Sequence, residues 1–294
     1  MTGIDTPAGG TEPSTIAANR VGLYSAILTV VTTVITFGLA ITAVPNSGAG
    51  CRVDCVGYPY LDTLSEFPGD YLWMPPAMIL VVLYVVLVAS IHAQASPQKG
   101  VYGQIGLSFA LLSAVVLLGD YFVQFSVVPI SLKNGQTEGI ALLTQYNPYG
   151  VFIVLEELGY LLMSLSFVFL APVFAHQGRL ASAVRWVFVA GFVLTTAFLV
   201  VISAYYGLER MDRFEIAAIS IDWLVLVVNG MLLSVLFRRQ LKQSRGAYAR
   251  DYGIGTNAEK VPLNAYYRYG PASFRPYSPG CVENMNSRKF SGDV

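Results

Sequence analysis

Charged residues are scarce in this sequence and histidine is almost absent. The first deficit argues against a soluble domain, and the second excludes metal and haem sites that need several histidines. Only 12% of the 294 residues are charged, whereas 54% are hydrophobic, and soluble domains usually have about 25% charged residues. The two histidines, His92 and His176, are too few for the sites of di-iron enzymes, b-type haem proteins or intramembrane metalloproteases. We therefore expect lipid to be the main solvent of this chain, and no metal or cofactor.

Six long apolar runs dominate the sequence. A bilayer core about 30 Å thick is crossed by roughly 20 helical residues that rise about 1.5 Å each. The runs lack the period-2 alternation of membrane β-strands, so they indicate helices. The sequence predicts an all-α, polytopic integral membrane protein with a six-helix transmembrane bundle. The expected spans are 21–44, 71–93, 104–128, 149–175, 186–206 and 216–237.

The two ends of the chain differ from the spans. Residues 1–20 form a polar leader with a single basic residue, Arg20, and the first run is interpreted as a retained signal anchor, with a cleaved signal ending near Ala43 as the alternative. Residues 238–294 begin with basic side chains and then become rich in Tyr, Gly and Pro. This composition predicts a disordered cytoplasmic tail, whose basic start either binds anionic membrane lipid or simply follows the last span as a stop-transfer flank.

Lysine and arginine near the spans predict the orientation, because cytoplasmic loops carry an excess of both. One set of loops and termini holds nine of them and the other set of loops holds four. This predicts that both termini are cytoplasmic and that the membrane is a plasma or inner membrane. This asymmetry is topological and gives no indication of nucleic-acid binding. The nine are Arg20, Lys99, Arg179, Arg185, Arg238, Arg239, Lys242, Arg245 and Arg250, and the four are Arg52, Lys133, Arg210 and Arg213.

The outer loops contain further signals. Cys51 and Cys55 lie in the acidic loop 45–70, and in an oxidising space they are expected to form a disulfide, with two unpaired thiols as the alternative. The loop 131–148 could form a short interfacial helix near Ile140. The charged segment 207–215 is expected to be a solvated hairpin with local ion pairs.

Carboxyl groups within the spans are the main candidate site. Counting from the predicted outer ends puts Asp120, Glu156 and Asp222 at one depth, roughly 9–11 Å below the outer surface. An ionisable group that faces lipid costs at least about 2.5–3.5 kcal/mol, so these acids should converge on the bundle interior or a water-filled cavity. Of the adjacent pair, Glu157 is favoured over Glu156 as the cavity member, because it shares a helix face with Tyr160.

Other polar residues extend the candidate site along the same helix faces. Gln124 lies four residues after Asp120, Glu156 is four residues before Tyr160, and Asn229 lies seven residues after Asp222. Aromatic residues at the outer level are either interface anchors or a cage for a cationic ligand. The predicted ligand-binding set is Asp120, Gln124, Glu156, Glu157, Tyr160, Asp222 and Asn229.

Four carboxyl groups in the membrane without a basic partner have two possible roles. Like charges in a low-dielectric site cannot all ionise, so one acid is expected to hold a proton and to hydrogen-bond to another in a structural clasp. Alternatively, the acids bind a proton, a cation or a small amine. Neither interpretation involves a catalytic residue.

Three functions remain open from the sequence. The first is a transporter or channel-like protein with an outward-facing acidic cavity. The second is a non-catalytic sensory or scaffold protein, and the third is a lipid-modifying enzyme that uses paired carboxylates as acid and base.

Overall fold

A computed structural model describes residues 13–43 and 47–251, and helices are their only regular secondary structure. Most of these residues, Ser14–Arg245, form one compact unit. The α-helices and 3₁₀-helices are α1 (Pro13–Thr42), η1 (Leu61–Glu66), η2 (Gly69–Tyr71), α2 (Met74–His92), η3 (Pro97–Lys99), α3 (Gly100–Ser126), α4 (Val128–Lys133), α5 (Ile140–Leu143), α6 (Val151–Leu170), η4 (Ala171–Phe174), α7 (Arg179–Tyr206), η5 (Gly207–Arg210) and α8 (Arg213–Asp251).

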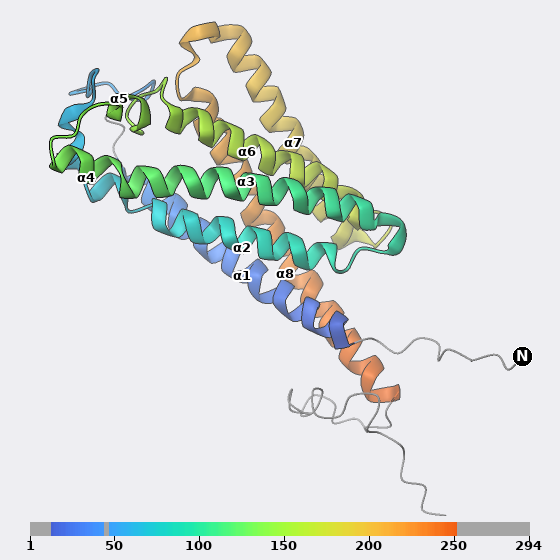
Figure 1. Cartoon of the computed structure of the whole chain (residues 1–294). Coiled ribbons are helices and arrows are strands. Elements are labelled where there is room, and N and C mark those ends of the chain that lie inside the picture. Colours follow the sequence, from blue (N-terminus) through green and yellow to red (C-terminus); the bar gives the residue numbers. More distant parts are fainter. Residues whose placement is uncertain (1–12, 44–46, 252–294) are drawn as a thin grey trace, which may run out of the picture. The chain divides into compact units, whose positions relative to one another are not determined.

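Six helical segments are long and apolar enough to cross a membrane, which supports the predicted integral multi-pass protein. They lie side by side as a bundle (Figure 1). The candidate spans are Ile16–Thr42, Gly69–His92, Pro97–Lys133, Val151–Phe174, Arg179–Arg210 and Arg213–Ser244.

Several boundaries differ from the sequence-based expectation. The fifth helix begins at Arg179, seven residues before the expected start, directly after Gly178, whose φ of 94° suits glycine. The sixth continues as α8 through the basic residues to Asp251, beyond the expected start of the tail at 238. Arginine, lysine and glutamine favour helix, so a basic segment can extend a span beyond its apolar part. The rest of the predicted tail, 252–294, and most of the leader, 1–12, lie outside the described residues.

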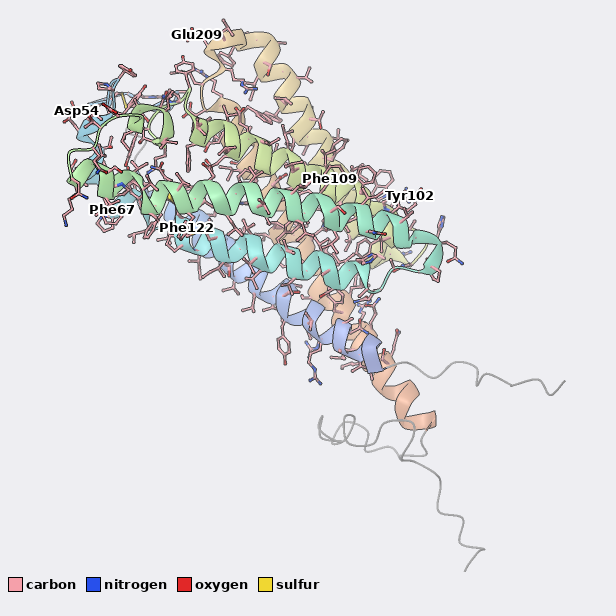
Figure 2. The ribbon with its side chains drawn as sticks, viewed as in Figure 1. Asp54, Phe67, Tyr102, Phe109, Phe122 and Glu209 are labelled. Carbon is pink, nitrogen blue, oxygen red and sulfur yellow. A yellow bond between two sulfur atoms is a disulfide. The ribbon has the colours of Figure 1, made fainter. Side chains whose placement is uncertain are left out.

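Most of the described loops lie at one end of the bundle. Here Cys51 and Cys55 form the expected disulfide, and the predicted short helix is present as α5. Asp54, from the first loop, and Glu209, from the α7–α8 connection, both lie at this end, whereas Tyr102 lies at the opposite end (Figure 2). We call the end with Asp54 and Glu209 the disulfide end.

Helices α3 and α6 are packed closely through small residues. Leu117 of α3 rests against Gly159 of α6. A Cβ added at Gly159 would clash with Cδ2 of Leu117. The hydroxyl of Ser113 donates to the carbonyl of Gly159 at 2.8 Å, and Ser166 donates to the carbonyl of Gly106 at 2.7 Å. Small residues and hydroxyl bonds of this kind let two membrane helices approach closely.

The other helices surround this pair. Tyr84 of α2 packs edge-on against Phe167 of α6 at 5.9 Å, and Phe188 of α7 stacks on Phe167 at 5.3 Å. Helix α1 packs on α8, where Gly22 lies under the ring of Phe237. Helix α6 therefore occupies the centre of the bundle, and side chains that it carries inward are shielded from lipid.

The α3–α6 contact predicts different effects for two glycine substitutions. Gly159→Val should force Leu117 away and lower the stability by about 1–3 kcal/mol, a typical cost of overpacking. Gly119→Val is the matched control, because Gly119 of α3 has no atom near its added Cβ. Thermal unfolding in detergent measures both, and equal melting temperatures for the two variants would contradict the packing.

Candidate functional site

A small acidic pocket opens at the disulfide end of the bundle, with a volume of about 160 Å³. Three carboxyl groups line it, from η2, from the residue before α8 and from the first turn of α8. Three aromatic side chains, an amide and a hydroxyl complete its polar and ring-bearing lining. These residues are Asp70, Asp212 and Glu215, with Trp73, Tyr146, Phe152, Gln145 and Ser47.

Hydrogen bonds hold the mouth of the acidic pocket in place. The hydroxyl of Tyr146 donates to Asp70 Oδ2 at 3.0 Å, and the backbone N–H of Ala49 donates to Asp212 Oδ1 at 2.9 Å. Burial raises the pKa of Tyr146 well above its usual value, so its phenol remains a neutral donor at physiological pH. The first loop and the start of α8 are thereby joined at the mouth.

Three carboxyl groups from different helices meet beneath the pocket. Glu215 of α8 lies beside Glu156 of α6, and Asp120 of α3 is close enough to interact electrostatically with both. Glu156 is 0% exposed and Asp120 is 5% exposed. We call these three residues the carboxyl cluster.

The carboxyl cluster favours a shared proton or a bound cation. Ionised carboxylates only accept hydrogen bonds, so Glu156 and Glu215 can hydrogen-bond to each other only if one of them holds a proton. Without it, Glu156 Oε2 and Asp120 Oδ2 are buried and have no hydrogen-bond donor in the protein. Unpaired buried acceptors of this kind are costly, which favours occupation by a proton or by a cation with N–H donors.

A line of hydroxyl groups leads inward from the cluster. The hydroxyl of Tyr121 donates to Glu156 Oε1 at 2.6 Å and also bonds to the hydroxyl of Tyr160 at 2.8 Å. The indole N–H of Trp223 donates to the same Tyr160 oxygen at 3.1 Å. Tyr160, one of the predicted site residues, therefore connects the cluster to Trp223 in the first third of α8.

Asp222 lies deeper than the sequence count placed it. Its Oδ1 accepts hydrogen bonds from Ser164 at 2.8 Å and from Thr195 at 3.3 Å. Glu215 is level with Glu156, and Asp222 follows it by two helical turns, about 10 Å. The expectation of one common depth for Asp222 and Glu156 was wrong, because α8 begins three residues before its predicted start and α6 begins two residues after its own.

Glu157 has the basic partner that the sequence analysis did not expect. Its Oε2 forms an ion pair with Arg210 of η5, so the acids are not all without a cation. The preference for Glu157 as the member facing the other acids was also wrong, since Glu156 occupies that place. Adjacent residues on a helix point about 100° apart, and α6 turns Glu156 toward α3 and α8 and Glu157 toward the α7–α8 connection.

Two further predicted residues lie apart from the acids. Gln124 donates to the hydroxyl of Tyr71 at 3.3 Å and accepts from the backbone of Gln145 at 3.2 Å. Asn229 donates to the carbonyl of Val184 at 3.4 Å. Both side chains join helices or loops, and no hydrogen bond connects either to a carboxyl group among the described residues.

Sequence reasoning missed Glu215, Asp212 and Tyr121. The segment 207–215 was expected to be a solvated hairpin, but its last residue is inside α8 and contacts Glu156. A signal was present, because Glu215 precedes Asp222 by seven residues and so shares its helix face. Tyr121 was considered only as an aromatic near the outer interface, although its hydroxyl touches Glu156.

The ion pair predicts that removal of one partner is worse than removal of both. Arg210→Gln leaves Glu157 nearly buried without a counter-charge, which costs about 3–5 kcal/mol in a fully buried pair and less here, because Arg210 is 29% exposed. The double variant Arg210→Gln/Glu157→Gln should recover part of that loss. Thermal unfolding in detergent measures this, and additive losses would contradict a direct pair.

Comparison with known proteins gives no further assignment. No protein family matches the chain, and neither a curated protein nor a solved structure shows significant similarity to it. The interpretation of the site therefore depends on its own geometry and chemistry.

Proposed function

We propose that this membrane protein binds a small cation, either a proton or an amine in its ammonium form, in the acidic pocket and the carboxyl cluster. The observation that carries the proposal is the meeting of Glu156, Glu215 and Asp120 beneath a pocket lined by further acids. No Lys, Arg or His is among the residues that line this pocket in the described part of the chain. A cation would supply the positive charge that the protein does not place there.

The chemistry of the pocket favours an ammonium ion over a large solute. A volume of about 160 Å³ admits a solute of only a few heavy atoms. An ammonium group donates N–H bonds, and the acceptors available to it are Glu215, which lines the pocket, and the unpartnered oxygens of Glu156 and Asp120 beneath it. The faces of aromatic rings attract cations, and Trp73 and Phe152 belong to the lining.

The hydroxyl line below the cluster supports movement of a proton farther into the bundle. Tyr121 and Tyr160 form consecutive short hydrogen bonds from Glu156, and Asp222 lies deeper with Ser164 and Thr195. Hydroxyl groups can donate and accept at once, as proton transfer requires. This arrangement favours a transporter over a protein that only binds its ligand.

The orientation proposed for this function places the pocket outside the cytoplasm. The nine-to-four distribution of basic residues puts the loops of the disulfide end on the extracytoplasmic side. The Cys51–Cys55 disulfide agrees with this orientation, because disulfides persist in oxidising compartments. Both termini would then be cytoplasmic, and the ligand would enter from outside.

Uptake of radiolabelled methylammonium into proteoliposomes tests the proposal. Glu156→Gln and Glu215→Gln should each lower the uptake rate about tenfold or more, which corresponds to loss of a charge-assisted hydrogen bond worth about 1.5–3 kcal/mol. A pH-sensitive dye in the lumen reports any proton that moves with the amine.

Glu138→Gln is the matched control, since it also removes one carboxylate at the disulfide end but from an exposed side chain. It should transport like the unmodified protein. Equal uptake by all variants, or no uptake above protein-free liposomes with the unmodified protein, would refute the transport proposal.

A further inference from the structure

A second cavity lies between α6 and the end of α7, separate from the acidic pocket. Its volume is about 340 Å³, and we call it the lateral cleft. Toward η5, α7 diverges from α6 (Figure 1). Most of the residues that line the lateral cleft are apolar, and Glu157, Arg210 and Ser203 are the polar exceptions. The remaining lining residues are Pro148, Tyr149, Ile153, Val154, Gly207, Leu208 and Met211.

The last three turns of α7 are only partly covered by the protein, where Leu199 and Ile202 pack against the core. Thr195 is the last buried residue of this helix, and none of the residues 196–206 is buried. The same segment is apolar on most of its faces, so water is a poor neighbour for it. In a membrane the space beside it would be filled by an apolar molecule.

The polar residues of the lateral cleft lie at one level, near the helix ends. Arg210 pairs with Glu157 and contacts Ser203 Oγ at 3.4 Å. A guanidinium has five N–H donors in a planar fork and binds phosphate well. Glu157 is 5% exposed, and its Oε1 is buried with no hydrogen-bond donor in the protein. The cleft thus offers donors for an anion beside an acceptor for a cation.

We propose that the lateral cleft is a binding site for one glycerophospholipid with a primary ammonium headgroup, of the phosphatidylethanolamine type. Its phosphate accepts N–H bonds from Arg210, and its ammonium donates to Glu157 Oε1. One acyl chain extends from the cleft toward the bilayer interior, beside the unburied turns of α7. The charges of the headgroup and of the protein alternate, so each buried group gains a partner.

The size of the lateral cleft separates this ligand from two other occupants. A volume of about 340 Å³ admits the headgroup region of one lipid, whose chains then lie outside the cleft, but not one turn of a transmembrane helix, which is about 10–12 Å wide with its side chains. A helix of a second copy or of a partner would therefore not enter. A quaternary ammonium headgroup has no N–H to donate to Glu157, and a glycerol headgroup has no positive charge.

Lipid retention by the purified, delipidated full-length protein tests this site. The protein is incubated with phosphatidylethanolamine, phosphatidylcholine or phosphatidylglycerol of identical acyl chains, and bound lipid is counted by native mass spectrometry. Phosphatidylethanolamine should be retained about tenfold more than the other two, as expected for one charge-assisted hydrogen bond.

Two variants distinguish the lateral cleft from general lipid binding. Val154→Trp should fill the cleft and abolish the preference while the ion pair remains, and Arg210→Gln/Glu157→Gln should abolish it by removing both charges. Val115→Trp is the control, because Val115 is 71% exposed on α3 and does not line the cleft. An unchanged preference in Val154→Trp, equal retention of the three lipids, or a dimer that Val154→Trp dissociates would each overturn the proposal.

Discussion

A carboxyl group inside a bilayer is stable only if protein groups shield it from lipid and provide partners, and this constraint organises the bundle. Asp222 of α8 joins α6 and α7 through Ser164 and Thr195. Glu157 of α6 holds the α7–α8 connection through Arg210. Glu156 joins α6 to α3 and α8 through Tyr121 and Glu215. Each acid is thus a polar tie between helices that otherwise touch through apolar surfaces.

The partners divide these acids into two kinds. Asp222 has hydroxyl donors and Glu157 has a guanidinium at one carboxyl oxygen each, and the second oxygen of each is buried without a donor in the protein. Glu156, Glu215 and Asp120 have one another, and acids can pair only with a proton or a cation between them. The first kind joins helices through donors on other residues, whereas the second places three acids side by side and is incomplete in positive charge within the protein. This incompleteness, and its position beneath an acidic pocket, locates the proposed function.

The fold follows from the sequence more directly than the site does. Continuous apolar runs fix six spans, and even the four-residue helix α5 has a local signal. Helix rotation and helix ends are less certain, because apolarity varies slowly along a span. Errors of three residues at the start of α8 and two at the start of α6 excluded Glu215 and placed Asp222 near the level of Glu156. A rotation of about 100° exchanged Glu156 and Glu157, and Arg210 was counted as solvent-exposed because its partner is distant in sequence.

Calorimetric titration of the purified protein with methylammonium in phosphate and in HEPES buffer tests the central claim most directly. If the carboxyl cluster holds a shared proton that a cation replaces, binding releases that proton and the measured heat differs between the two buffers. Glu156→Gln should remove the difference. Binding heat that is equal in both buffers, or no binding at all, would contradict the account.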